Sequence, residues 1–163
     1  MSNPSDAKQS ATAQLPGDLQ RSRVYAAEDT LVSEMGPRLR TWKSVEAFAE
    51  SILTSEELNE LFPNHPAGIS LHRRSRSATA SAAVVSRGEI WIRDGSWNAL
   101  TVIHEISHHL ASPDTTHGAR FVSIELVLVR TWCGFTAYGE LLHAFRTRSV
   151  AIDEEFLRAG RNP

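Results

Sequence analysis

The chain has 163 residues, of which 41% are hydrophobic, and a formal net charge of −2 at pH 7. This length and composition suit one globular domain with a single core. The near-neutral charge argues against binding of nucleic acid through a strongly basic surface, and no apolar stretch is long enough to span a bilayer. Because the single Cys133 cannot form an internal disulfide and no secretory signal run is present, we expect a cytoplasmic protein.

The beginning of the chain has little to bury. Residues 1–18 are mainly Ser, Ala, Pro, Gln and Asn, which predicts a disordered tail. From Leu19 onward, apolar side chains recur at helical spacing until Gly36-Pro37 breaks the pattern. Val24-Tyr25 is equally compatible with the start of a strand, so the type of this element stays open.

Two short helices should follow. Ser44 predicts the N-cap of a helix whose apolar positions are Val45, Phe48, Ala49 and Ile52. Thr54-Ser55-Glu56-Glu57 fits a capping box that opens a second helix, which ends at Pro63. We expect these helices to pack as one layer.

The middle of the chain changes from helical to alternating periodicity. Three short runs rich in β-branched or aromatic residues predict strands at 69–73, 80–85 and 89–93. Ser86-Arg87-Gly88 predicts a hairpin turn between the last two, so we expect a small, mainly antiparallel sheet. Arg73-Arg74-Ser75-Arg76 is a basic cluster, and such clusters most often lie in solvated loops.

The stretch from Trp97 to Phe121 contains His104-Glu105-Ile106-Ser107-His108, which is the H-E-x-x-H pattern. On a helix, two histidines four residues apart leave the same face, so both imidazoles can reach one metal ion. Glu105 lies beside them, where it can accept a proton from water. Apolar side chains surround the motif, as expected of a buried helix that holds its ligands rigidly.

A catalytic zinc ion usually has three protein ligands, so the sequence should supply one more. We favour His117, nine residues after His108 and across a short loop. Glu125 is an alternative ligand, because some zincins use a glutamate at a similar separation, and it could instead accept a hydrogen bond from a ligand. Asp114, inside the loop, is a weaker alternative that should cap a turn.

The helices after the strands have clear boundaries. Gly95-Ser96 predicts the N-cap of the motif helix and Ser112-Pro113-Asp114 its end. Residues 119–132 are almost continuously apolar and predict a buried helix that ends before Gly134. Apolar positions from Tyr138 to Phe145 mark a last helix, and residues 151–163 should form a charged, solvated tail.

The motif order resembles that of known metalloproteases. His104-Glu105-x-x-His108 followed by His117-Gly118-x-x-Phe121 is similar to SprT-like and WLM-type domains. The opening Gln20-Arg21-Ser22-Arg23-Val24-Tyr25-Ala26-Ala27-Glu28, with HEISHHL and HGARF, looks more closely like a family of small actinobacterial and actinophage metallohydrolases. The likeness covers residues 19–150.

The resemblance implies an α+β, minimal zincin-like domain over residues 19–150, with a small sheet packed against the motif helix. It implies one Zn²⁺ per chain, held by His104, His108 and His117, with Glu105 as the general base. In zincins the strand in the position of residues 89–93 borders the cleft and pairs with extended substrate, so its edge should bind peptide by strand addition.

Three functions fit these features. The first is a zinc-dependent metallopeptidase that acts on a peptide or protein. The second is a zinc hydrolase of a small amide, ester or cell-wall fragment, because fold and metal do not fix the substrate. The third is a non-catalytic module with structural zinc, which has no need of Glu105. Tyr138, His143 and Arg120 are candidate donors to the developing oxyanion, although each also fits a structural role.

Overall fold

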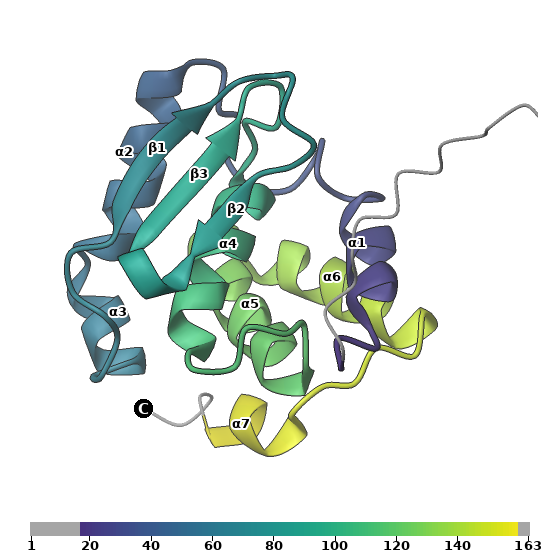
Figure 1. The fold of residues 1–163 in the computed structure, drawn as a ribbon. Coiled ribbons are helices and arrows are strands. Elements are labelled where there is room, and N and C mark those ends of the chain that lie inside the picture. The colour runs from purple at the N-terminus through teal and green to yellow at the C-terminus, as the bar shows by residue number, and fades with distance from the viewer. Residues whose placement is uncertain (1–16, 160–163) are drawn as a thin grey trace, which may run out of the picture.

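The computed structural model describes residues 17–159, which form seven α-helices, a short 3₁₀ helix and one three-stranded sheet (Figure 1). The predicted α+β class is confirmed. Helix α4, Ala99–Ala111, carries the H-E-x-x-H motif and lies between the sheet and helix α5, Ala119–Trp132. Because α4 is covered on both sides, packing fixes the positions of its side chains.

The sheet has strand order β1-β3-β2, with β1 at Ser70–Arg74, β2 at Ala82–Val84 and β3 at Glu89–Arg93. Strand β3 is antiparallel to β2 but parallel to β1, so the prediction of a mainly antiparallel sheet is wrong for the second pair. Strands β1 and β2 run in opposite directions without pairing, and β3 lies in the gap between them.

The central place of β3 also corrects the expected mode of substrate binding. Both edges of β3 are hydrogen-bonded to neighbouring strands, so it cannot add a peptide strand. The edge strand nearest helix α1, Arg21–Glu28, is β2. The predicted turn before β3 is present as the 3₁₀ helix Val85–Arg87, followed by Gly88 in the left-handed conformation (φ 64°).

Helices α2, Trp42–Leu53, and α3, Glu56–Leu61, lie where two helices were predicted. The N-cap of α3 is Ser55, one residue after the Thr54 that the predicted capping box requires, and its side chain accepts the N–H of Leu58 at 3.1 Å. The N-cap of α2 is Thr41 rather than Ser44. Ser44 is instead the third helical residue of a capping box, in which its hydroxyl accepts the N–H of Thr41 at 3.1 Å.

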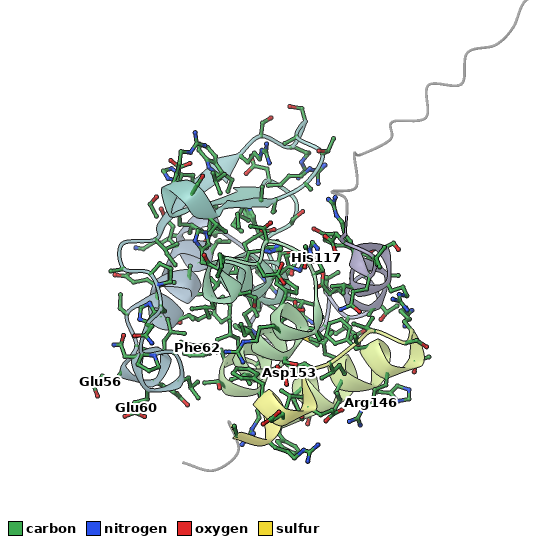
Figure 2. The ribbon with its side chains drawn as sticks, turned by 60° about the horizontal axis from the view of Figure 1, so that its bottom comes forward. Glu56, Glu60, Phe62, His117, Arg146 and Asp153 are labelled. Atoms are coloured by element: carbon green, nitrogen blue, oxygen red, sulfur yellow. The ribbon has the colours of Figure 1, made fainter. Side chains whose placement is uncertain are left out.

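The C-terminal part is more ordered than predicted. Helix α6, Phe135–Thr147, is followed by a further helix α7, Glu154–Ala159, where the sequence predicted a solvated tail. Leu157 is only 3% exposed, and α7 packs on α5. The N–H of Asp153 donates to Ser123, and Arg146 pairs with Glu154 at 3.0 Å; Figure 2 labels Asp153 and Arg146 on this side of the molecule.

The described residues share one hydrophobic core. It is centred on side chains with no more than 1% exposure from β3, α4 and α5: Ile90, Ile92, Ile103, Ile106, Phe121 and Leu126. Burial of each such side chain stabilises the fold by about 1.5–3 kcal/mol. Between residues 17 and 159, no helix combines the length and apolarity that crossing a membrane would need.

Candidate metal centre

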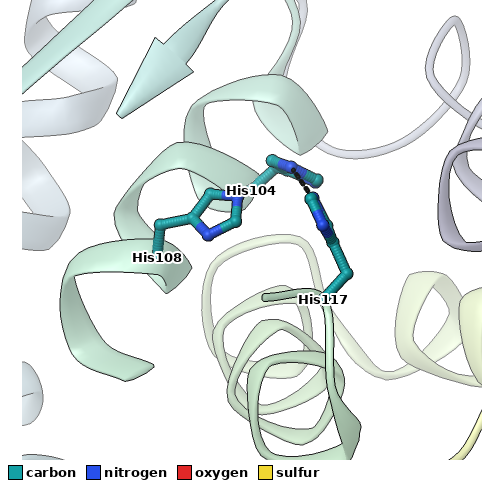
Figure 3. A group of neighbouring side chains, drawn as sticks. All are labelled: His104, His108 and His117. Atoms are coloured by element: carbon teal, nitrogen blue, oxygen red, sulfur yellow. Dashed lines mark hydrogen bonds between the residues drawn. The ribbon is translucent and has the colours of Figure 1, made fainter. Parts of the chain in front are cut away.

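Three imidazoles converge beside the C-terminal half of α4 (Figure 3). His104 and His108 come from successive turns of α4, and His117 comes from the loop between α4 and α5. One ring nitrogen from each lies within 4.8 Å of the other two, so the group can hold a metal ion. Phe121, in the first turn of α5, packs against all three rings at centroid distances of 4.4–5.0 Å.

Two nitrogens of this group lie so close together that they cannot both be without a proton or a metal ion. Nε2 of His104 lies 3.2 Å from Nε2 of His117, and the Nδ1 atom of each ring is hydrogen-bonded to a carboxyl group. Two lone pairs that face each other repel, so this geometry requires a proton or a metal ion between them. Zinc–nitrogen bonds of 2.0–2.1 Å at a tetrahedral angle would separate two ligand nitrogens by about 3.3 Å. The observed spacing therefore fits two ligands of one metal ion.

Behind His104 lie two buried carboxyl groups. The Nδ1–H of His104 donates to Oε1 of Glu28 at 2.7 Å, whereas Oε1 of Glu125 is 3.7 Å away, beyond hydrogen-bond distance. Burial raises the pKa of Glu28 to about 8. Burial and the neighbouring Glu28 raise the pKa of Glu125 well above its ordinary value. At neutral pH this pair of carboxyl groups therefore retains a proton.

His117 is held by residues from before α1. Its Nδ1–H donates to Oδ2 of Asp18 at 2.8 Å, and its backbone N–H donates to Oδ1 of the same carboxylate at 3.1 Å. The side-chain amide of Gln20 donates to the carbonyl of His117 at 2.7 Å. Figure 2 places His117 inside the molecule beside α1. Asp18, which the sequence assigned to a disordered tail, is 4% exposed; residues 1–16 of that tail lie outside the described residues.

The protonation of the three imidazoles differs. Burial and the proximity of His104 lower the pKa of His108 to about 2 and that of His117 to about 4. Burial also acts to lower the pKa of His104, but the neighbouring carboxyl groups of Glu125 and Glu105 outweigh it, so the pKa is raised. Of the three rings, His104 is therefore the one that takes up a proton most readily, whereas His108 and His117 are neutral at neutral pH.

Glu105 points from α4 toward the sheet edge. It is 4% exposed and lies close to the backbone N–H of Ala83 in β2. Burial raises the pKa of Glu105 above the ordinary carboxyl value, although His104 and the Ala83 N–H oppose the change. A carboxylate with a raised pKa that is fixed beside a metal-binding histidine is suited to accept a proton.

A cavity of about 190 Å³ opens beside Glu105 and His104. Its walls are α1 and the loop between β1 and β2, represented by residues 79–81, and α4 forms its floor. Tyr25 of α1 lines this cavity and stacks on the ring of His104 at a centroid distance of 5.1 Å. Larger hollows of about 320 and 390 Å³ lie elsewhere, but neither is lined by a residue of the motif pair His104 and Glu105.

The basic cluster, whose Arg73 and Arg74 end β1, helps to shape this wall. Arg74 donates to the carbonyl of Ala80 at 3.1 Å, and Arg93 of β3 donates to the carbonyl of Ala78 at 2.6 Å. Arg73 pairs with Asp94 at 2.7 Å. Two arginines of the cluster thus have structural partners, and Arg74 fixes the loop that faces α1.

The alternative ligands and donors have other positions. Asp114 accepts the N–H and hydroxyl of Thr116, at 2.9 and 2.8 Å, and so caps a turn as predicted. Arg120 stacks its guanidinium on Phe156 at 3.7 Å. His143 is exposed on α6, and Tyr138 is buried on the same helix beside Phe135; neither lines the cavity. The ring of His109 bonds to the carbonyl of Glu89 rather than joining the three histidines.

Sequence reasoning missed four residues of the site: Asp18, Gln20, Tyr25 and Glu28. The last three belong to the opening segment that carried the family resemblance. A second signal was available, since Arg21, Tyr25 and Glu28 are spaced four and three residues apart and share one face of α1. Val24 and Ala27 occupy the buried apolar face of α1. The polar residues Arg21, Tyr25 and Glu28 therefore mark a second face of this helix that contacts other parts of the protein.

Comparison of the chain with protein families, curated proteins and solved structures gives no match.

Proposed function

We propose that this protein is a zinc-dependent hydrolase that cleaves amide bonds, as a metallopeptidase does, with one zinc ion per chain held by His104, His108 and His117. The observation that carries the proposal is the distance of 3.2 Å between Nε2 of His104 and Nε2 of His117. Both rings are hydrogen-bonded to carboxyl groups through Nδ1. Three neutral nitrogen donors that leave a fourth position open are typical of catalytic zinc. The resemblance to small zincins agrees with this assignment.

Glu105 is the proposed general base. When bound, zinc supplies Lewis-acid chemistry and lowers the pKa of a coordinated water toward about 7. Glu105 accepts the proton of the attacking water and transfers it to the leaving nitrogen, a role helped by its raised pKa. A purely structural zinc site would not need this carboxylate in its buried place.

Tyr25 is the proposed donor to the oxygen that becomes negative during attack. Burial, with the negative charge of Glu105, raises the pKa of Tyr25, so its hydroxyl keeps its proton at neutral pH. It lines the same cavity as Glu105 and contacts the rings of His104 and His117. A hydroxyl donor in a partly buried site can stabilise developing charge by several kcal/mol.

For a peptide substrate, the edge of β2 replaces the predicted edge of β3. Strand β2 is only three residues long, and the carboxylate of Glu105 lies close to the N–H of Ala83. We therefore expect few backbone hydrogen bonds to substrate, with one side chain placed in the cavity. The cavity volume of about 190 Å³ favours a second candidate, the hydrolysis of a small amide, because sites for drug-sized ligands occupy about 300–1,000 Å³.

The test combines metal analysis with a substrate screen. The purified protein should contain about one zinc per chain, and a library of peptides and small N-acyl amides should include a substrate for it. Glu105→Gln should retain zinc and lose about 10²–10⁴-fold in turnover. Glu60→Gln on α3, an exposed glutamate far from the histidines (Figure 2), is the control and should match the parent protein.

Two results would contradict the proposal. The first is a protein that contains no zinc and takes up none on dialysis. The second is a Glu105→Gln variant as active as the parent. A zinc-loaded protein that cleaves no member of either substrate class would favour the non-catalytic module.

A further inference from the structure

Residues 18–28 touch two of the three histidines on the side opposite the metal-facing nitrogens. Asp18 accepts the Nδ1–H of His117 at 2.8 Å, and Glu28 accepts the Nδ1–H of His104 at 2.7 Å. Both contacts are buried and join residues 99 and 76 positions apart in the sequence. One continuous segment therefore holds a ring from α4 and a ring from the loop that follows it.

The same segment is fixed to the C-terminal part of the chain. Gln20 donates to the carbonyls of His117 and Ala151, at 2.7 and 3.3 Å, and accepts the N–H of Ala151 at 2.8 Å. Arg23 donates to the carbonyl of Ser149 at 2.8 Å. These bonds align the segment with the loop that carries His117, so that Asp18 meets the ring and the backbone N–H of that residue together.

An imidazole can bind a metal through Nε2 only when the proton is on Nδ1 or absent. A carboxyl oxygen that accepts the Nδ1–H fixes this tautomer, prevents rotation of the ring and raises the basicity of Nε2. At both His104 and His117 a carboxyl oxygen accepts the Nδ1–H, and the two Nε2 atoms face each other at 3.2 Å. The segment therefore determines which nitrogen each of these rings offers.

We propose that Asp18 and Glu28 are positioning residues, which hold His117 and His104 in the metal-binding tautomer and thereby couple metal binding to the docking of residues 18–28. This inference rests on the proposed metal site. By thermodynamic linkage, if docking of the segment raises metal affinity by some factor, metal binding must stabilise the docked segment by the same factor. The metal should then protect the segment from proteolysis.

The first test measures Zn²⁺ affinity by competition with a chelator. In Asp18→Asn only one oxygen remains for two N–H donors, and in Glu28→Leu the Nδ1–H of His104 loses its acceptor. Each variant should bind Zn²⁺ about 10- to 100-fold more weakly, the usual effect of a residue that orients a ligand. Asp114→Asn is the control, because Asp114 lies in the same loop as His117 but bonds to Thr116. It should stay within about threefold of the parent.

The second test uses readouts that a purely structural role would not change. The visible absorption spectrum of the Co²⁺-loaded protein should change in Asp18→Asn and not in Asp114→Asn, because the first alters the environment of a ligand. Trypsin should cleave after the exposed Arg23 more slowly when Zn²⁺ is bound, and this protection should be lost in Asp18→Asn. Circular dichroism establishes whether each variant is folded. If Glu28→Leu is unfolded, the conservative Asp18→Asn alone tests the inference.

The inference is wrong if Asp18→Asn is folded and binds Zn²⁺ within threefold of the parent, or if Asp114→Asn is weakened equally. It is also wrong if Zn²⁺ leaves cleavage after Arg23 unchanged. Failure of the metal site itself would look different, since the unaltered protein would then bind no Zn²⁺.

Discussion

The competition between protons and metal at the three histidines can be worked out from their pKa values. An exposed histidine has a pKa of about 6.5, so lowering the pH from 6 to 5 weakens its metal binding about eightfold, and three such ligands lose about 500-fold together. Here the pKa values of His108 and His117 are depressed to about 2 and about 4, so both rings are already neutral over this range. Only His104, whose pKa is raised, must release a proton when the metal binds.

We therefore expect Zn²⁺ affinity to fall about tenfold between pH 6 and pH 5, or about 1.4 kcal/mol. The direction follows from the sign of the shift, because a group that must lose a proton binds metal less well at lower pH. The assay is competition with a chelator whose own pH dependence is known, with circular dichroism at each pH to show that the fold persists. A loss of about 100-fold or more would refute the assignment of neutral His108 and His117.

Three further outcomes are expected. His117→Ala should weaken Zn²⁺ binding well beyond the roughly 10- to 100-fold limit expected for Glu125→Gln, and the reverse order in a chelator competition would make Glu125 the ligand. Gly36→Ala should destabilise the fold by about 2–5 kcal/mol in thermal denaturation, because its φ is 72° and a Cβ would lie 2.6 Å from Sγ of Cys133. The control is Gly68→Ala, which has a similar φ of 73° but open space around the new Cβ, and it should destabilise the fold less. Equal destabilisation by the two substitutions would contradict the steric argument. Burial raises the pKa of Cys133 to about 11, so its thiol should react with iodoacetamide at pH 8 over 100-fold more slowly than in urea, and equal rates would show that it is accessible.

Local signals predicted helices α2 to α6, with less accurate boundaries, but they did not predict α7 or decide between helix and strand for α1. The span 119–132 was predicted from its apolar run and matches α5, because a continuous apolar stretch has only one stable place, inside the core. The N-cap of α4 is Asn98, whose side chain accepts the N–H of Thr101 at 2.8 Å, rather than Gly95-Ser96. Several residues that can cap precede this helix, and only the path of the chain out of β3 selects one.

Pairings between distant residues could not be read from the sequence. The parallel pairing of β1 with β3 depends on a crossover, whereas hairpin signals describe only adjacent strands. The same limit applies to the site. Its histidines and Glu105 lie within fourteen residues and follow a known spacing, but the partners of two rings are Asp18 and Glu28, far away in the sequence. The motif predicts which residues face the metal and gives no information on what stands behind them.

The bonds of Gln20 have a consequence for the order in which the protein folds. They join residue 20 to His117 and to Ala151, across 97 and 131 positions of the chain. Closing loops of this length has an entropic cost that local contacts do not offset, so such contacts form late in folding. On the ribosome, α1 and the Asp18 segment must wait for α6 and the residues after it to leave the exit tunnel. A nascent chain that ends before residue 151 should therefore have helices and a sheet, but no high-affinity place for a metal ion.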